Sequence, residues 1–336
     1  VTYEEWGATH ENFQKFGAQI HLLKKPRLKV PFISHLARVW SIVKFCRQND
    51  IGVVYAHYQE ANLVSAVAQY FSKSKFVLTR HHSDCAYLDN NLREKIGDKI
   101  INRLARHYIA PSNIVYNQLV EVEKTNRSKI SRINYGYNFN NFSQPDFEKI
   151  KEIRKKFSSE LLLIQAARFI PEKRHNLLIE SIAKLRRMGL DFKLLLLGKG
   201  PIEENIKYQV ESLELRDSVF FLGYSNEIPN YYAAADLVVH LSISEASNSA
   251  VKEAAITGTP VAVCENVGDF SEYIVDNENG FLLSKENPQP DFERVIKSVV
   301  EDKSKLDLLG QNLKKEVLST FDFELIINQY QEINEK

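Results

Sequence analysis

The sequence predicts an α/β fold made of two Rossmann-like domains that face a central cleft. Short β-rich apolar runs alternate with amphipathic helical stretches along the whole chain, which is the pattern of parallel sheets covered by helices. The chain has 336 residues, about twice the length of one typical domain. A polar stretch, Asn138–Lys156, divides the alternation into two parts, so each part has the length of one domain.

Five apolar runs in the first half have the length and residue types of buried strands. They are Gln19–Leu23, Ile51–Ala56, Lys75–Thr79, Tyr108–Ala110 and Ile130–Ile133. Between these runs, apolar residues recur every three or four positions, as they do on the buried face of an amphipathic helix. The expected helices are Thr9–Phe16, Ile33–Asn49, Ala61–Phe71, Leu92–Arg106 and Ser112–Lys124.

The second half repeats the same alternation with six strands and six helices. The expected strands are Leu161–Ala166, Phe192–Leu197, Val219–Leu222, Leu237–His240, Pro260–Cys264 and Gly280–Leu283. The expected helices are Asn176–Met188, Pro201–Leu213, Ile228–Ala234, Ser249–Thr257, Asp291–Val300 and Ser304–Thr320. We therefore expect domains over residues 1–140 and 159–320, a linker over 141–158, and a C-terminal helix over 321–336 that packs back on the first domain.

The composition excludes several classes of protein. With 44% hydrophobic and 26% charged residues, the chain can bury a core and is not a disordered tail. Its net charge of +1 argues against a dedicated nucleic-acid binder. Cys46, Cys85 and Cys264 are odd in number and far apart, which excludes a disulfide framework and zinc-site spacing and favours a reducing, cytoplasmic location.

The near-zero net charge hides an asymmetry between the two halves. Residues 1–145 hold 20 Lys and Arg against 11 Asp and Glu, whereas residues 146–336 hold 24 against 32. A basic first half suggests that this part faces something anionic. The alternative is that the basic residues form an ordinary solvated surface.

The carboxyl ends of the strands are the places to look for a site, because open parallel sheets bind ligands there. Arg168 and Lys173 follow the strand Leu161–Ala166 and stand beside an expected helix start. Two cations next to free helix N–H groups suit a phosphate or diphosphate. The alternative is a solvated loop with two surface cations.

A pair of carboxylates follows the strand Leu237–His240. Glu245 lies in the loop and Glu253 in the next helix, where each can accept paired hydroxyls such as those of sugars and ribose. Backbone amides around Asn248 and Ser249, at the helix start, can hold phosphate oxygens. Paired carboxylates often form only a solvated helix face, but their neighbours here are apolar.

Two histidines in the first half also follow strands. His81 comes after Lys75–Thr79, where a histidine can serve as a hydrogen-bond donor or a base near neutral pH. His57 follows Ile51–Ala56 and is either a second candidate or a structural histidine. The neighbouring His82 raises a metal site as an alternative, but no third ligand lies at a suggestive spacing.

Taken together, these motifs resemble a known family, the retaining GT-B-fold glycosyltransferases of family 4 (glycosyltransferase group 1). Arg168 and Lys173 match its cation pair, and Glu245 and Glu253 match its Glu-x7-Glu motif. His81 falls where the family places a cleft histidine. Supporting matches are Leu197–Pro201, Phe221–Gly223, Tyr232–Asp236, Gly258–Pro260 and Asn279–Phe281.

The resemblance implies an enzyme that moves a hexose-type sugar from a nucleotide-sugar donor to a glycan or lipid-linked acceptor in cell-surface polysaccharide synthesis. Residues 1–140 would bind the acceptor and residues 159–320 the donor. Arg168 and Lys173 would neutralise the diphosphate of the donor, and Glu253 would accept both ribose hydroxyls. The further implied contacts are Gly223 and Tyr224 beside the base, Glu245 on the donor sugar, Asn248 and Ser249 on phosphate and sugar, and His81 on the donor sugar or acceptor.

The resemblance also bears on cofactors and partners. The chain contains no Asp-x-Asp sequence, so we expect no cofactor and metal-independent transfer. We expect contact of the basic half with an anionic membrane, at its inner face, and no nucleic-acid partner. Two alternatives stay open: a nucleotide-sugar epimerase of similar architecture, and a nucleotide-sugar-binding protein without turnover.

The sequence departs from the family pattern at three places. Ala246-Ser247-Asn248 replaces the usual Gly-Phe-Gly after the first glutamate and would narrow the space around the donor sugar. A later Gly-Gly becomes Gly268-Asp269. The opening strand and Gly-rich loop of the family have no counterpart after Val1, so we expect that part of the active-site wall to be missing from this chain.

Overall fold

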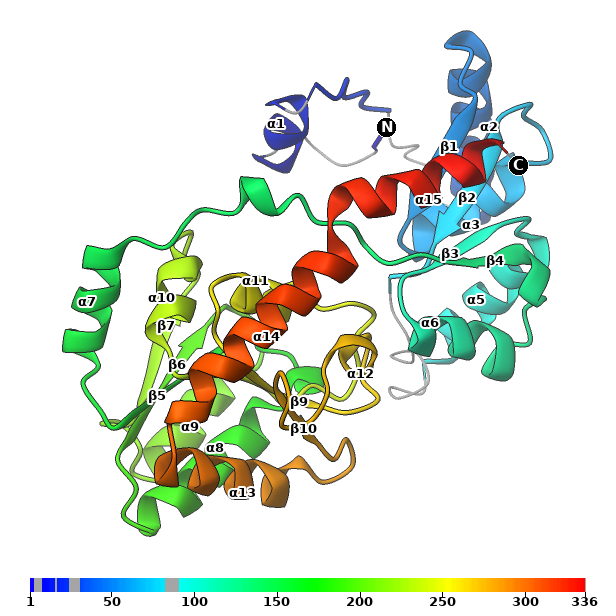
Figure 1. Cartoon of the computed structure of the whole chain (residues 1–336). Coiled ribbons are helices and arrows are strands. Elements are labelled where there is room, and N and C mark those ends of the chain that lie inside the picture. The colour runs from blue at the N-terminus through cyan, green and yellow to red at the C-terminus, as the bar shows by residue number, and fades with distance from the viewer. Residues whose placement is uncertain (3–7, 16, 24–30, 82–90, 336) are drawn as a thin grey trace. The chain divides into compact units, whose positions relative to one another are not determined.

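The computed structural model describes residues 1–2, 8–15, 17–23, 31–81 and 91–335 (Figure 1). The chain divides into two compact units. The first consists of Val1–Arg80, Asp89–Ile109 and Glu123–Ser131, and the second of His81–Leu88, Ala110–Val122 and Arg132–Lys336.

A parallel sheet organises the first part of the chain. Its strand order is β1 (Val53–His57), β2 (Lys75–Thr79), β3 (Tyr108–Ala110) and β4 (Ile130–Arg132). The helices of this part are α1 (Ala8–Lys15), α2 (Pro31–Gln48), α3 (Gln59–Ala68), α5 (Leu92–Leu104) and α6 (Asn113–Asn117), which continues as a π-helix over Gln118–Val122. Buried residues of α2, α3, β2 and α5, such as Val43, Ala66, Leu78 and Ile101, pack into one apolar core.

The sheet of the second unit has six parallel strands whose order reverses in its middle. From edge to edge they run β10 (Phe281–Leu283), β9 (Val261–Cys264), β8 (Leu237–His240), β5 (Leu161–Ala166), β6 (Phe192–Leu197) and β7 (Val219–Gly223). The chain proceeds outward from β5 to β7 and then, from β8, outward on the other side. The reversal between β5 and β8 makes their loops diverge, and such a switch point is where open α/β sheets bind ligands.

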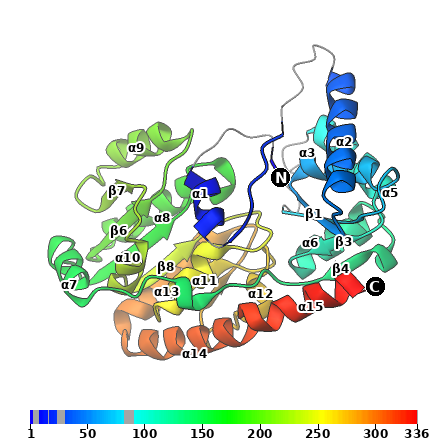
Figure 2. The ribbon, with the colours of Figure 1, turned by 90° about the horizontal axis from the view of Figure 1, so that it is seen from above.

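Helices pack in two groups around this sheet, which confirms the predicted α/β class (Figure 2). One group contains α8 (His175–Arg187), α9 (Glu203–Ser212) and α13 (Pro288–Glu301). The other contains α10 (Ile228–Ala234), α11 (Ser249–Ile256), α12 (Phe270–Tyr273) and α14 (Ser304–Phe321). All six residues of β5 are buried, as a strand covered on both sides requires.

The C-terminal helix α15 (Phe323–Glu335) meets the segment around Gly136. Tyr137 and Asp322 form a parallel bridge, and a Cβ on Gly136 would lie 3.0 Å from the Ile326 side chain. Residues 132–335 belong to the second unit, so these contacts are internal to it. The expected packing of this helix on the first domain stays a prediction.

One expectation from the sequence was wrong in its local detail. The segment Gln19–Leu23 is not a strand, and only Leu22 forms a single parallel bridge, with Thr2. Leu22 is 47% exposed, so no buried face fixes the register of a longer pairing. Part of the expected linker is helix α7 (Phe147–Lys156), which is capped by Asp146 and anchored by the double hydrogen bond of Arg154 to Asp236.

None of the helices in the described part of the chain combines the length and the apolar composition that a membrane span requires.

Gly310 provides a test of the packing between α14 and the end of α11. A Cβ on Gly310 would lie 1.9 Å from the carbonyl oxygen of Gly258, so no side chain fits there. We expect Gly310→Ala to lower the free energy of unfolding of the second unit by about 1–3 kcal/mol, as overpacking does. Denaturant unfolding measures the loss, with the exposed Ser319→Ala on the same helix as the control. Equal stability of the two variants would contradict this packing.

Candidate functional site

The site lies where the loops after β5 and β8 diverge at the switch point of the six-stranded sheet. The loop after β5 runs from Ala167 into the 3-10 helix Pro171–Lys173, and the loop after β8 runs to Asn248. The Ile243 N–H donates to the Glu172 carbonyl at 3.0 Å, which joins the two loops. Residues far apart in the sequence are therefore held together at the carboxyl ends of adjacent strands.

Two glycines allow the loop after β6 to lie directly against the loop that carries Arg168. A Cβ on Gly198 would lie 2.0 Å from the Ala167 carbonyl oxygen, and one on Gly200 would lie 2.3 Å from that of Phe169. Phe169 is buried, whereas Arg168 is exposed and its side chain makes no hydrogen bond or ion pair with the residues that the structure describes. The Arg168 guanidinium is therefore a cation available to a ligand.

Lys173 and Glu245 form an ion pair across the switch point. Their side chains are only 13% and 11% exposed, so water screens the pair weakly. Burial by itself raises the pKa of Glu245, but the Lys173 ammonium and hydrogen bonds from Lys173 and Ser242 outweigh it and hold the pKa below its ordinary value. Glu245 is thus an ionised acceptor at neutral pH.

Asn248 hydrogen-bonds to the Glu245 carboxylate and to His240. The Asn248 Oδ1 accepts the Val251 N–H at 3.1 Å, so its Nδ2 faces Glu245 Oε1 and His240 Nε2, both at 2.9 Å. His240 Nε2 must then accept, which leaves the hydrogen on Nδ1, 2.7 Å from the Ser242 Oγ. Complete burial lowers the pKa of His240 to about 4, so the ring is neutral.

The start of helix α11 presents backbone N–H groups next to this network. Asn248 is the cap residue, and its side chain satisfies the Val251 N–H. The N–H groups of Ser249 and Ala250 have no partner within the helix, as in the first turn of any helix. Because a helix N-terminus favours negative charge, this turn suits a phosphate group.

Glu253 lies one turn further along α11 and lines a cavity of about 250 Å³. The other walls come from the segment Asn141–Pro145, from Asn226 and the first residues of α10, and from the end of α11. Burial raises the pKa of Glu253. Among the described residues, no side chain forms a hydrogen bond or ion pair with the Glu253 carboxylate, so its oxygens are open to a ligand.

Gly223 is the last residue of β7, and Tyr224 follows it at the same end of the sheet. The Gly223 carbonyl accepts the Gly198 N–H at 2.8 Å, and Gly223 has a φ of +67°, a conformation that favours glycine. The Tyr224 side chain is 75% exposed. Both residues therefore lie at the same end of the sheet as the loops after β5 and β8. In the described part of the chain, the Tyr224 side chain makes no hydrogen bond with Lys173 or Glu245.

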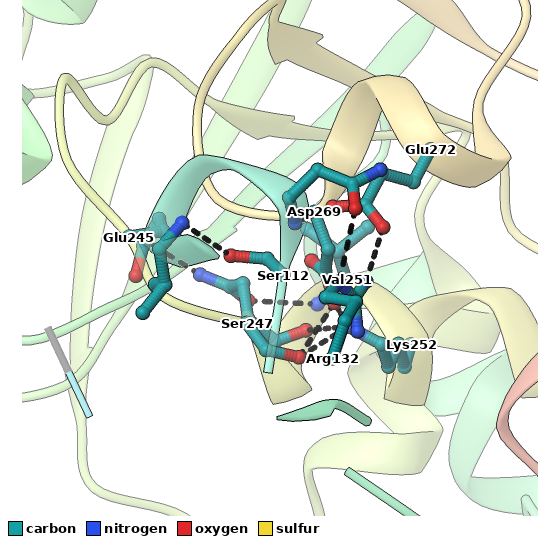
Figure 3. A network of polar contacts seen from close by, with 11 residues as sticks. Ser112, Arg132, Glu245, Ser247, Val251, Lys252, Asp269 and Glu272 are labelled. Carbon is teal, nitrogen blue, oxygen red and sulfur yellow. Dashed lines mark hydrogen bonds and ion pairs between the residues drawn. The ribbon is translucent and has the colours of Figure 1, made fainter. Parts of the chain in front are cut away.

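A second ion pair, Lys252–Asp269, lies fully buried beneath the site (Figure 3). The Lys252 Nζ lies 2.7 Å from Asp269 Oδ2, which also accepts from the Ser247 Oγ at 2.6 Å. Burial lowers the pKa of Lys252, and Asp269 opposes that shift. Asp269, which stands where the family pattern has a second glycine, therefore has a structural role here. It neutralises Lys252 inside α11, the helix that carries Glu253.

His81 lies shortly after β2 in the chain and contacts Tyr135. Its Nδ1 is 2.6 Å from the Tyr135 hydroxyl, and the two rings stack with centroids 5.5 Å apart. His57, at the end of β1, lines a larger cavity of about 640 Å³ in the first unit, together with Arg38 and Glu60. The neighbouring His82 lies outside the described residues.

The structure brings Lys173, Glu245 and Asn248 into direct contact and places Arg168 on the same loop as Lys173. Glu253 lines the cavity of about 250 Å³, whose lining includes none of these four residues. His240 was not predicted as a site residue, although it is the last residue of β8, just as His57 is the last residue of β1. Lys252 was not predicted either; its signal in the sequence is a charged residue among Val251, Ala254 and Ala255 on a buried helix face.

Comparison with protein families gives two adjoining matches. Residues 146–316 match the family described as Glycosyl transferases group 1, and residues 4–140 match Glycosyltransferase Family 4.

Two curated enzymes are similar along most of the chain. N-acetyl-alpha-D-glucosaminyl L-malate synthase of Bacillus anthracis is 26% identical over 314 residues, which cover 89% of this chain and 78% of that protein. The N-acetylgalactosamine-N,N'-diacetylbacillosaminyl-diphospho-undecaprenol 4-alpha-N-acetylgalactosaminyltransferase of Campylobacter jejuni is 24% identical over 318 residues, with 90% and 83% covered.

A solved structure shows the same fold over nearly the whole chain. Alr3699/HepE of Anabaena, crystallised with UDP and glucose, superimposes with a TM-score of 0.85 and 21% identity, covering 98% of this chain and 89% of that one.

The neutral His240 gives a stability prediction with a defined pH window. Its pKa is about 4 in the folded protein and about 6.5 when unfolded, so the unfolded chain takes up the proton first as the pH falls. Neutral His240 therefore contributes on the order of 3 kcal/mol to the free energy of unfolding above pH 6.5. This contribution is lost progressively between about pH 6.5 and 4.

The test compares the unfolding free energy of the wild-type protein and His240→Gln at several pH values in that window. Gln keeps one donor and one acceptor but cannot titrate, so the variant should lose less stability on acidification. His175, whose pKa burial lowers to about 3, remains in both proteins as a common background. Parallel pH profiles would show that His240 is not buried in the neutral form.

Proposed function

This chain belongs to the group 1, family 4 glycosyltransferases, and from that premise we propose that it transfers a sugar from a nucleotide-sugar donor, with retention of configuration. The acceptor is a glycan or a lipid-linked glycan in cell-surface polysaccharide synthesis. One observation carries the proposal. An exposed cation, a buried ion pair and an open helix N-terminus meet at the switch point of the six-stranded sheet, which suits a sugar diphosphate.

Arg168 and Lys173 bind the diphosphate of the donor in this proposal. Both follow β5, and the amides of Ser249 and Ala250 at the start of α11 supply uncharged donors. As the sugar–phosphate bond breaks, negative charge grows on the departing phosphate, and fixed positive groups stabilise it. Because Lys173 is already paired with Glu245, the diphosphate must share the ammonium with that carboxylate.

Two carboxylates recognise the hydroxyl groups of the donor. Glu245 is held ionised and oriented by Lys173 and Asn248, so it accepts hydrogen bonds from hydroxyls of the sugar. Glu253 accepts the two ribose hydroxyls in its cavity, where its carboxylate has no competing protein partner among the described residues. Gly223 and Tyr224 border the base, and UDP is the nucleotide to test first because HepE was crystallised with it.

The acceptor belongs to the first part of the chain. The Campylobacter jejuni relative is named for a diphospho-undecaprenol acceptor, which supports a lipid-linked substrate here and a place at the cytoplasmic face of a membrane. His81, fixed by Tyr135, contacts the donor sugar or positions the acceptor.

Donor binding is tested by calorimetry with UDP and UDP-sugars on three variants. Losing a charge-assisted hydrogen bond weakens binding by about 10- to 100-fold. We therefore expect Arg168→Ala and Lys173→Ala each to raise the Kd for UDP by a factor in that range. Glu253→Gln should bind UDP more weakly and lose the preference for UDP over 2′-deoxy-UDP. Glu301→Gln, exposed on α13, is the matched control. A Glu253→Gln variant that still prefers the ribose form would remove Glu253 from this role.

Transfer itself is tested with labelled donor, an undecaprenol-linked acceptor and product analysis by NMR. We expect a glycoside with the anomeric configuration of the donor, formed equally with and without EDTA. Activity that EDTA abolishes and a divalent metal restores would overturn metal independence. A product that is an epimer of the donor would identify an epimerase, and binding without any product would identify a non-catalytic binder.

A further inference from the structure

Lys199 is an exposed cation on the loop after β6. The backbone on both sides of it is fixed, because Gly198 and Gly200 lie so close to the loop after β5 that neither has room for a Cβ atom. The Lys199 carbonyl accepts the Phe169 N–H at 3.2 Å. Among the residues that the structure describes, none forms a hydrogen bond or ion pair with the Lys199 ammonium. The loop therefore holds this cation in a defined place and leaves its charge available to a ligand.

The side chain of Lys199 extends to the end of β7. A Cβ on Gly223 would lie 3.7 Å from the Lys199 Cε atom, so the two residues are neighbours. A register shift between β6 and β7 leaves Leu222 as an extra residue on β7. Such bulges occur next to active sites, where they redirect the residues that follow. Lys199, Gly223 and the exposed Tyr224 together form the β6–β7 corner of the site.

Strand order separates the β6–β7 corner from the phosphate-binding groups. Along the sheet the order is β8, β5, β6 and β7, and the last three lie side by side (Figure 1). The start of α11 follows β8, and Arg168 and Lys173 follow β5. Neighbouring strands are about 4.8 Å apart, so three spacings put β7 about 14 Å from β8. A nucleotide whose diphosphate lies at β8 and β5 can therefore reach the β6–β7 corner with its base.

We propose that Lys199 selects the base of the donor by donating a hydrogen bond to O4 of uracil, an inference that rests on the proposed function. An ammonium group has donors and no acceptor, so it binds a carbonyl oxygen and finds no partner in an amino group. Uracil carries the carbonyl oxygen O4 where cytosine carries the amino group N4. The Tyr224 ring can stack on either base and does not distinguish them. Lys199 is thus the residue of the β6–β7 corner that discriminates between uracil and cytosine.

Calorimetry with UDP and CDP tests the role of Lys199 in base selection. A hydrogen bond from a charged group is worth about 10-fold or more in affinity, so the wild type should bind UDP about 10-fold more tightly than CDP. Lys199→Met should raise the Kd for UDP by about the same factor and leave that for CDP nearly unchanged. Lys199→Arg keeps a cationic donor and should keep the preference for UDP. Lys297→Met, exposed on α13, is the matched control and should bind both nucleotides as the wild type does.

A second probe addresses the O4 atom itself. In 4-thio-UDP a sulfur atom replaces O4, and sulfur is a weaker hydrogen-bond acceptor than a carbonyl oxygen. The wild type should therefore bind 4-thio-UDP more weakly than UDP, whereas Lys199→Met should bind the two nucleotides alike. Equal melting temperatures of the variants and the wild type show that the exposed substitution leaves the fold intact.

Three outcomes would overturn the role of Lys199. A wild type that binds CDP as tightly as UDP has no base selection to explain, and a Lys199→Met variant that keeps the full preference for UDP removes Lys199 from base recognition. An equal loss of affinity for UDP and CDP would assign Lys199 to the phosphates instead. In all three cases the protein still binds a nucleotide, so the proposed transferase function stands. A wild type that binds no nucleotide would overturn both.

Discussion

The reversal of strand order between β5 and β8 is the constraint on which the site depends. In the sheet, β6 lies on one side of β5 and β8 on the other, so the loops after β5 and β8 leave the sheet in different directions and open a crevice between them. Side chains from both loops line this crevice at the carboxyl ends of the strands. The Lys173–Glu245 pair closes across that divergence, and Gly198 and Gly200 let a third loop lie against it. Topology thus gathers residues that are more than 70 positions apart in the sequence.

The site rests on a network of buried polar groups that hydrogen-bond one another. The Asn248 amide donates to the Nε2 atom of neutral His240 and to Glu245, and the Nδ1 atom of His240 is hydrogen-bonded to Ser242. Beneath them, Lys252 and Asp269 neutralise each other with no exposure to water. Removing one partner of such a pair strands a buried charge, which costs far more than an exposed salt bridge contributes. Helix α11, which carries Lys252 and Glu253, is therefore held in place by electrostatic interactions as well as by packing.

The predictability of this protein follows from burial. The central strands β5, β8 and β9 of the second sheet are apolar runs buried on both faces, so composition predicts them correctly. Leu22 is exposed, and the strand predicted around it reduces to one bridge. Helix α7 looks like a linker because it is polar, and only the structure shows that Ile150 and Ile153 pack against the core and that Arg154 binds Asp236. Lys173 and Glu245 were predicted as site residues because each follows a strand. Their pairing depends on the order of the strands in the sheet, which the alternation of strands and helices along the sequence does not specify.

The Lys173–Glu245 ion pair carries a consequence for turnover. Inorganic phosphate would attract the ammonium but repel the carboxylate, so the pair discriminates against an anion that brings no hydroxyl hydrogen to Glu245. A ligand that carries both negative charge and a hydroxyl group, as a sugar phosphate does, can bind Lys173 and Glu245 at once. Once the sugar has left, the nucleotide loses that second partner, and Lys173 can return to Glu245. Under the proposed function, the same contact that selects the substrate therefore speeds release of the spent nucleotide.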